Sequence, residues 1–423
     1  MIDIKYLREQ PDALRKNVKL RNASVDVDAL FVLDERRLTL LRTLEEMRRE
    51  RNEVAEAMKS ATADTRPGLI ERGKAIKEQI GVQETELETV ETEWKGMLAR
   101  IPNHTHPDAP IGASDEDNKE IKQVGEIQKF SFRPRSHVEL AEMHDLMDFT
   151  RAAKVSGAKF YFLKGKLALL EQALIKYGLD LISKEGYEVL TTPDVAKEAV
   201  LIGKGFLPRG PEKQVYYVEE QDLALVGTSE ITVLGYHMDE VIPEAEVPKK
   251  YVAFSHCFRT EAGAYGRESY GLYRVHQFAK VEMFAFAKPE QSEAIHVEFL
   301  RLEEMFWQSL GIPYRVVDCC TGDLGGSDYR RYDIEAWMWG KNEGRGGWGE
   351  VTSTSNCIDY QARGLQIKYG GKEGGREYVH TLNGTVVATP RALLSILENY
   401  QQEDGSILIP EVLKSYCGFD RIG

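Results

Sequence analysis

The stretch FRTEAGAYGRESYGLYRVHQFAKVEMF, residues 258–284, contains the end of one predicted β-strand and the beginning of another. The β-rich run YVAFSHCFR (251–259) leads into it, and the run FAKVEMFAF (278–286) leads out of it. Because the two runs are close in sequence, we expect them to pair as antiparallel strands, with residues 261–274 as the connecting loop. This hairpin favours a fold built on an antiparallel sheet.

Four side chains of this hairpin indicate a binding site. Arg259 and Glu261 lie two residues apart and Phe278 and Glu282 four apart, so the members of each pair share a face of an extended chain. A guanidinium fork can hold a phosphate or a carboxylate, and an aromatic plane can hold a purine. The alternative interpretation is a surface salt bridge between Arg259 and Glu261, with Phe278 in the core.

Three further stretches carry groups suited to an amino acid, a polyphosphate and a metal ion. VGTSEI supplies small polar groups for an α-amino group and a hydroxyl: Thr228, Ser229 and Glu230. In LNGTVVATPRALLSILENYQ, Arg391 lies at the start of an amphipathic helix, whose N-terminus also favours a polyphosphate. GWGEVTSTSNC offers Glu350, Ser353 and Asn356 on a predicted strand, and their oxygens suit Mg²⁺ between phosphates.

The chain from residue 104 to residue 423 mixes β-rich runs with amphipathic helices. Predicted strands that are neighbours in sequence indicate an antiparallel sheet, with helices packed on one side. No GxxxxGKS sequence occurs, so a P-loop is not indicated. Other predicted strands are YEVLTTPDV (187–195), QVYYVEE (214–220), YRVVDCC (314–320), IEAWMWG (334–340) and WGEVTSTS (348–355). Predicted helices are LALLEQALIKYGLDLISKEG (167–186) and QSEAIHVEFLRLEEMFWQSLG (291–311).

Residues 28–101 have a different pattern, with apolar residues recurring about every 3.5 positions. The turn-forming stretch KSATADTRPG (59–68) interrupts this repeat, so we expect two helices in an antiparallel coiled-coil hairpin. Residues 59–77 carry five basic and two acidic side chains, whereas residues 84–93 carry five glutamates and no base. The basic end would attract phosphate; alternatively, these charges only solvate the coiled coil.

The length of the chain indicates two or three domains, and the residue patterns predict two: a helical arm at 1–103 and a second domain at 104–423. The net charge of −13 argues against nonspecific coating of nucleic acid. No run of 18 apolar residues is present, so no membrane partner is expected. The five cysteines form no CxxC pair and are interpreted as reduced thiols of a cytoplasmic protein, with no zinc expected. His104 and His106 are interpreted as solvated loop residues.

These stretches resemble the three signature motifs of class II aminoacyl-tRNA synthetases. The helix and strand that reach Pro193 resemble motif 1, FRTEAG…HQFAKVE motif 2, and NGTVVATPRALLSILENYQ motif 3. The stretches GTSE, VHQFAKVE, CTGDLG, EVTSTSNC and LNGT are similar to those of the seryl-tRNA synthetase family. The resemblance covers essentially the whole chain. It implies an α+β fold, with a class II antiparallel β-sheet catalytic domain flanked by helices and preceded by a long antiparallel α-helical coiled-coil arm.

The resemblance also implies an activity, its partners and its site residues. The substrates are L-serine, ATP with Mg²⁺, and tRNA(Ser), with tRNA(Sec) as a further acceptor, and the enzyme is a homodimer whose arm holds the tRNA. The implied catalytic residues are Arg259, Glu282 and Arg391. The implied serine-binding residues are Thr228, Ser229, Glu230, Arg259, Glu282 and Thr385. The implied ATP-binding residues are Arg259, Thr260, Glu261, Val275, Phe278, Glu350, Val351, Thr352, Ser353 and Arg391, with Glu350 and Ser353 also holding the metal and Arg267 a further ATP or tRNA contact.

The sequence departs from the family pattern at two positions. Tyr270 stands where an arginine commonly precedes the Gly-Leu pair of the motif 2 loop. Gly349 stands where an arginine often precedes the metal-binding glutamate, and Arg345 is expected to compensate.

Three other functions fit parts of the sequence. An amino-acid:carrier-protein ligase of the same fold would not need the full helical arm. A catalytically silent synthetase paralogue would not need Arg259, Glu282, Glu350 and Arg391 together. A coiled-coil scaffold protein would leave the second domain unexplained.

Overall fold

The computed structural model describes residues 1–206, 215–261, 271–371 and 374–423. It divides the chain into two compact units, one formed by Ile2–Ile101 and the other by Pro102–Gly423 with Met1. Within the described residues, every helix is too short or too polar to cross a bilayer.

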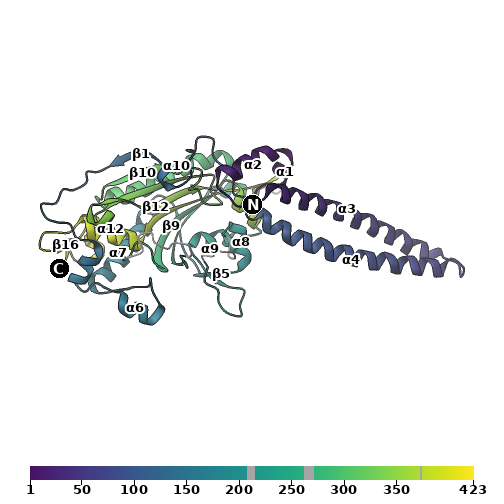
Figure 1. Cartoon of the computed structure of the whole chain (residues 1–423), viewed down its shortest axis with the longest axis horizontal. Helices are drawn as coiled ribbons and strands as arrows, with labels where there is room; N and C mark the ends of the chain where they lie inside the picture. The colour runs from purple at the N-terminus through teal and green to yellow at the C-terminus, as the bar shows by residue number, and fades with distance from the viewer. Residues whose placement is uncertain (207–214, 262–270, 372–373) are drawn as a thin grey trace. The chain divides into compact units, whose positions relative to one another are not determined.

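The helical unit consists of two short and two long helices: α1 (Ile4–Glu9), α2 (Pro11–Leu20), α3 (Val27–Ala57) and α4 (Arg66–Leu98). Asp26 caps α3, because its carboxylate accepts a hydrogen bond of 3.0 Å from the backbone N–H of Ala29. The turn-rich stretch separates the two long helices, and Pro67 lies in the first turn of α4. The long helices run antiparallel, side by side (Figure 1).

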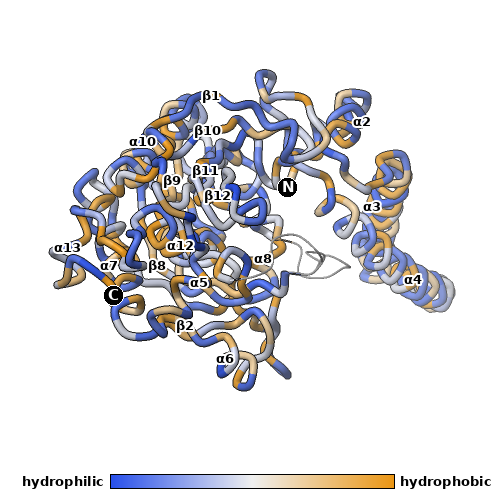
Figure 2. The backbone as a smooth tube through the Cα atoms, turned by 60° about the vertical axis from the view of Figure 1, so that its left-hand side comes forward, coloured by the Kyte–Doolittle hydropathy of each residue, from blue (hydrophilic) through white to orange (hydrophobic). Residues whose placement is uncertain are grey.

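A narrow apolar seam joins the two long helices. Leu44, Ile76 and Ile80 are buried in it, and Met47, Val54 and Leu87 pack against them. Hydrophilic and hydrophobic segments follow one another along both helices (Figure 2), as a repeat of about 3.5 residues predicts. Three glutamates of α4 pair with arginines of α3: Glu84 with Arg48, Glu86 with Arg36 and Glu91 with Arg37.

The second unit is built on an eight-stranded sheet whose order is β1-β10-β11-β12-β15-β9-β8-β4. Every neighbouring pair is antiparallel except β4 and β8. The predicted motif 2 hairpin corresponds to β8 and β9. The strands are β1 (Lys119–Val124), β4 (Glu188–Thr191), β8 (Lys249–Phe258), β9 (Gln277–Ala287), β10 (Tyr314–Asp318), β11 (Arg330–Met338), β12 (Gly347–Asn356) and β15 (His380–Ala388).

Strand β9 shows how the sheet separates core from site. Val281, Met283 and Ala285 face the main core, which contains α7 (Gly165–Ser183), α10 (Ser292–Ser309) and α12 (Thr389–Asn399). Phe284 and Phe286 face the opposite side and pack with α9 (Ser229–Tyr236) and α11 (Tyr360–Leu365). Helices therefore cover both faces of the sheet, rather than the single side that was expected. By the two-residue period, Phe278, Lys280 and Glu282 share the second face.

Shorter elements complete this unit. The predicted strand at 214–220 is absent from its described part, because Tyr217 forms only an isolated bridge with Ala224. The remaining helices are α5 (His137–Met143), α6 (Phe149–Ser156), α8 (Glu198–Lys204) and α13 (Glu411–Cys417). The remaining strands are β2 (Met147–Asp148), β3 (Phe162–Leu163), β5 (Val195–Ala196), β6 (Ala224–Leu225), β7 (Val241–Pro243), β13 (Lys368–Gly370), β14 (Arg376–Tyr378), β16 (Ile407–Leu408) and β17 (Arg421–Ile422).

Candidate active site

A cavity of about 460 Å³ lies on the second face of the sheet. It is lined mainly by residues of β9, β12 and β15 and by the loops next to them. The predicted site residues that line it are Thr228, Glu230, Arg259, Glu261, Val275, Phe278, Glu282, Glu350, Val351, Thr352, Ser353, Thr385 and Arg391.

Arg259 lies directly after β8 and is held from two sides. Its backbone N–H donates to the carbonyl of His276 at 2.9 Å, and its Nε donates to the carbonyl of Gly227 at 3.2 Å. Its guanidinium carbon lies 5.3 Å from the ring centre of Phe278, within cation–π range. Phe278 lines the cavity and is only half-buried, so it is not a core residue. The ion pair that Glu261 forms is with Arg274, at 2.9 Å, rather than with Arg259.

Glu282 lies deep in the cavity, with only 2% of its surface exposed. It is opposite Ala253 of β8 on one side and Thr385 of β15 on the other. Its Oε2 accepts a hydrogen bond from the hydroxyl of Thr228 at 2.5 Å and lies 2.7 Å from Nζ of Lys280. Lys280 also donates to Thr228 at 2.9 Å, so the three polar side chains form a closed triangle. A buried carboxylate with these partners is suited to bind a small polar substrate.

Glu230 lies at the start of α9 and has three side-chain donors among the residues that the structure describes. Its Oε1 accepts hydrogen bonds from Nε2 of Gln361 at 2.7 Å and from Nδ2 of Asn383 at 2.9 Å. Its Oε2 lies 2.9 Å from Nζ of Lys204. The hydroxyl of Thr228 caps α9 through the backbone N–H of Glu230, so one helix start positions both side chains.

A second group of charges lies at the β12 end of the cavity. Nη1 of Arg391 is 2.9 Å from Oε1 of Glu350, and its guanidinium lies 5.0 Å from the ring centre of Tyr273. Burial works against ionisation of Glu350, but the neighbouring arginines, chiefly Arg391 and then Arg331, outweigh it and lower the pKa of the carboxyl.

A β-bulge explains how Glu350 and Ser353 reach the same face although they are three residues apart. Thr352 pairs with Ile334 and Glu350 pairs with Glu335, so Val351 is an extra residue in β12. The extra residue shifts the alternation of faces by one position, so Glu350 and Ser353 lie on the same face and both line the cavity.

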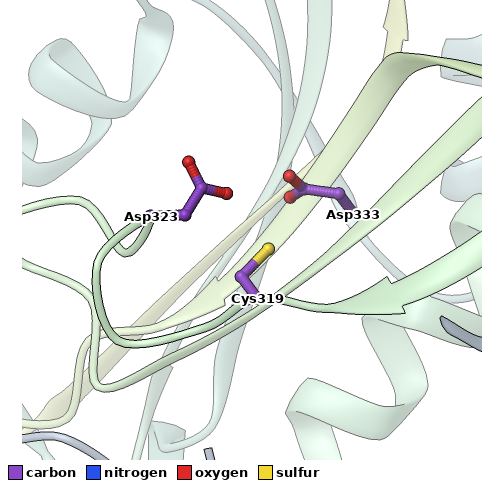
Figure 3. A group of neighbouring side chains, drawn as sticks. All are labelled: Cys319, Asp323 and Asp333. Carbon is purple, nitrogen blue, oxygen red and sulfur yellow. The ribbon is translucent and has the colours of Figure 1, made fainter. Parts of the chain in front are cut away.

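One candidate cation site among the described residues lies beside the cavity, where the side chains of Cys319, Asp323 and Asp333 point toward one another (Figure 3). Arg331 already supplies a cation to all three. Its Nε lies 2.9 Å from Asp333 and 3.3 Å from Sγ of Cys319, and its Nη2 lies 2.7 Å from Asp323. Burial also raises the pKa of the Cys319 thiol, which disfavours the thiolate that a metal would require. We interpret the cluster as the binding site of the Arg331 guanidinium.

Two family models match the chain. The seryl-tRNA synthetase N-terminal domain matches residues 1–105, and the class II tRNA synthetase core domain (G, H, P, S and T) matches residues 215–400. The serine--tRNA ligase of Treponema denticola is 50% identical over 424 residues, which cover all of both chains. This chain belongs to the seryl-tRNA synthetase family. The serine--tRNA ligase of Rubrobacter xylanophilus is also 50% identical, over all of this chain and 99% of that one.

Solved structures agree with this family membership. The seryl-tRNA synthetase of Pyrococcus horikoshii, complexed with ATP, is 36% identical with a TM-score of 0.88 and covers all of this chain and 99% of that one. The cytoplasmic enzyme of Naegleria fowleri, in complex with AMP, is 32% identical with a TM-score of 0.83, over all of this chain and 98% of that one. The predicted family and fold class are thereby confirmed.

Several residues implied by the family resemblance do not line the cavity. Ser229 is fully buried, with its hydroxyl 3.5 Å from Glu282, and Thr260 lies outside the lining. Arg267 and Tyr270 fall outside the described residues. Arg345 does not take the place of an arginine at 349, because it is exposed and its Nε donates to the carbonyl of Asn342. A side chain on Gly349 would instead meet Lys341, whose Cε would be 3.0 Å from the added Cβ, and Met338 at 2.6 Å.

The cavity also contains charged residues that the sequence motifs did not indicate. Lys280 could have been predicted from the sequence, since it lies between Phe278 and Glu282 on the same face of one strand. Lys204 and Arg331 could not have been predicted, because nothing in their local sequence distinguishes them from solvated charges. Asn383 belongs to LNGT, but its contact with Glu230 depends on tertiary structure.

Proposed function

We propose that this chain is a serine--tRNA ligase, which activates L-serine with ATP and transfers the seryl group to the 3′ end of tRNA(Ser), with tRNA(Sec) as a further acceptor. The observation that carries the proposal is the single cavity shared by Arg259, Glu282 and the Glu350–Arg391 pair. One end offers a buried acidic seat for a small polar amino acid, and the other offers cations and oxygen ligands for a triphosphate.

In the first step, an oxygen of the serine carboxylate attacks the α-phosphorus of ATP. The bond from that phosphorus to the β-phosphate breaks, and pyrophosphate leaves seryl-adenylate behind. Arg259 lines the same cavity and is the group we assign to the charge that develops on the α-phosphate. Positioning and electrostatics therefore supply most of the catalysis, as in other phosphoryl-transfer and nucleotidyl-transfer sites.

Glu282, Thr228 and Thr385 would hold serine, and Phe278 would stack on the adenine beside Glu261 and Val275. All six line the cavity. An amino acid without a hydroxyl would leave a buried polar group unpaired, at a cost of about 1–3 kcal/mol. Arg391 would hold the γ-phosphate.

The residues present at the β12 end fit Mg²⁺. Glu350 contributes a carboxylate and Ser353 a hydroxyl, hard oxygen donors on one face, and part of the Glu350 side chain remains exposed to the cavity. When bound, Mg²⁺ would neutralise charge on the phosphates. Glu350 would hold the ion while Arg391 fixes the direction of its carboxylate.

In the second step, a ribose hydroxyl at the 3′ end of the tRNA attacks the carbonyl carbon of seryl-adenylate, and AMP leaves. The long arm would hold the tRNA, with the arm of one subunit guiding the tRNA to the site of its partner. The basic residues at 59–77 support this role.

A homodimer is supported by exposed apolar side chains on neighbouring elements of the second unit. Val155 of α6 is 70% exposed, Phe162 of β3 46%, Leu169 of α7 55% and Val189 of β4 48%. β4 is an edge strand, which offers unpaired backbone groups as well. Light scattering should give twice the chain mass of 47.9 kDa. The five unpaired cysteines support a cytoplasmic location.

One assay separates this function from its rivals. Serine-dependent exchange between ATP and pyrophosphate should be present, and [¹⁴C]serine should then be transferred to total tRNA. A carrier-protein ligase would give exchange without tRNA charging, and a silent paralogue would give neither. Absence of exchange with the full-length protein and Mg²⁺ would refute the proposal.

A further inference from the structure

Lys204 is the last residue of α8 and lies outside the stretches that resemble the family motifs. Its side chain nevertheless lines the cavity, is only 13% exposed, and brings Nζ to 2.9 Å from Oε2 of Glu230. Burial works to lower the pKa of Lys204, but Glu230 outweighs it and the pKa is raised, so the ammonium form persists at neutral pH. The contact is therefore a buried ion pair.

The two carboxylates of the cavity are occupied differently. Glu230 accepts from Gln361 and Asn383 at Oε1 and from Lys204 at Oε2, so both oxygens are engaged. Among the described residues, the side-chain donors of Glu282 are Thr228, Ser229 and Lys280, and all three lie at Oε2. Because a carboxylate can accept about four hydrogen bonds, Glu282 retains a whole oxygen for a donor of the substrate, whereas Glu230 has room for about one more hydrogen bond.

The charge of a buried carboxylate determines which donor it can accept. Without Lys204, Glu230 would present a net negative charge and would favour a cation over a hydroxyl. With Lys204 in contact, Glu230 remains a hydrogen-bond acceptor but its charge is cancelled, and a second ammonium nearby would be repelled.

We propose that Lys204 determines specificity in the amino-acid pocket: by cancelling the charge of Glu230, it makes the pocket accept a hydroxyl side chain and reject an ammonium side chain. This inference rests on the proposed function, since it concerns which amino acid the same cavity activates. Lys204 acts through Glu230 and is a positioning residue.

The test compares L-serine with L-2,3-diaminopropionate, which has an amino group in place of the hydroxyl. Amino-acid-dependent ATP–pyrophosphate exchange is measured with the full-length protein, at a pH low enough to keep both amines protonated. The readout is the ratio of kcat/KM for the two amino acids. We expect K204Q to lower the preference for serine by about tenfold or more, equivalent to about 1.4 kcal/mol, while KM for ATP stays unchanged. K204R should keep the wild-type preference, since it keeps the charge.

K197Q is the matched control, because Lys197 is an exposed lysine at the N-cap of the same helix. If K204Q does not melt cooperatively, the double variant K204Q/E230Q replaces it, because it contains no unpaired buried charge; its preference should match the wild type. The inference is overturned if K204Q retains the wild-type ratio, if K204R loses it as K204Q does, or if the double variant prefers the diamine. Failure of the proposed function would instead appear as absence of serine-dependent exchange in the wild type.

Discussion

In the long arm, the pair Arg48–Glu84 joins two helices and remains in solvent, whereas in the catalytic unit two of the pairs that line the cavity, Lys280–Glu282 and Lys204–Glu230, are buried. Arg48 and Glu84 of the arm are 2.8 Å apart with 50% and 49% of their side chains exposed. Lys280 and Glu282 of the cavity are 2.7 Å apart with 7% and 3% exposed. The two distances are nearly equal, but the two pairs differ in their exposure to solvent.

This difference sets the expected cost of substitution. An exposed pair contributes about 0–1 kcal/mol, because water and salt screen it. Breaking a buried pair by removing one partner costs about 3–5 kcal/mol, because the other charge loses its compensation. The arm should therefore tolerate many changes of charge, and the cavity very few.

The largest effect is expected for Arg259→Ala. Arg259 is the cation that we assign to the reacting α-phosphate, so its loss should lower kcat/KM for ATP–pyrophosphate exchange by about 10³-fold. Arg301→Ala is the control, because Arg301 is 55% exposed on α10 and pairs with Glu185 away from the cavity. Near-normal exchange by Arg259→Ala would remove Arg259 from the catalytic assignment.

The second prediction concerns the pH dependence of stability, which should differ between the two units. His296 of α10 is 1% exposed, and its Nε2 lies 3.0 Å from the carbonyl oxygen of Thr354. Burial lowers its pKa from 6.5 to about 4, so the unfolded chain binds a proton between these values and the folded chain does not. Stability of the catalytic unit is thus lost as the pH falls from 6.5 to 4, by about 3 kcal/mol at the lower end.

Urea unfolding at several pH values measures this loss, and His296→Asn should flatten the dependence. Burial also lowers the pKa of His237 and of His380, so the difference between wild type and variant isolates His296. The arm, residues 2–101, contains no histidine, so its stability should not show the loss that histidine protonation causes between pH 6.5 and 4. Equal slopes for wild type and variant would contradict the prediction.

A smaller effect is expected at the basic end of the arm. Lys59, Arg66 and Lys74 are exposed, so K59Q/R66Q/K74Q should leave pyrophosphate exchange intact. Charging of tRNA should fall about tenfold, and the salt dependence of tRNA binding should weaken by about one unit of slope per lost contact. The matched control is K5Q/K16Q/K19Q, which removes three exposed lysines from outside the long helices. Equal loss in both triple variants would mean that only net charge matters.

How far the sequence predicts this molecule also differs between the two units. The coiled-coil repeat indicated α3 and α4, because each residue in such a hairpin meets the other helix by its position in the repeat. In the catalytic unit, the two-residue period of a strand correctly placed Phe278 and Glu282 on the same face of the sheet, but it would place Glu350 and Ser353 on opposite faces. The bulge at Val351 brings them together, and its cause is the register with β11, which local sequence does not contain.

The buried partners could not be predicted for the same reason. Glu230 lies in a recognisable motif, but Lys204 and Gln361 reach it from α8 and α11, which are far away in sequence. Local propensity also failed in the predicted strand at 214–220, whose described residues, 215–220, form one isolated bridge and no strand. Motifs thus indicated many of the side chains that line the cavity, while tertiary packing determines which charges surround them.

The smallest expected effect is the sharpest test of the comparison. Arg48→Ala removes an exposed ion pair of the arm and should cost at most about 0.5 kcal/mol, with less in high salt. Leu44→Ala, one turn away, removes a side chain that is 1% exposed in the apolar seam and should cost about 2–4 kcal/mol. Thermal melts of both variants at low and high salt measure the two costs. If Arg48→Ala destabilised the arm as much as Leu44→Ala does, the exposed pairs would act as a network, and the contrast between a charge-tolerant arm and a charge-sensitive cavity would no longer hold.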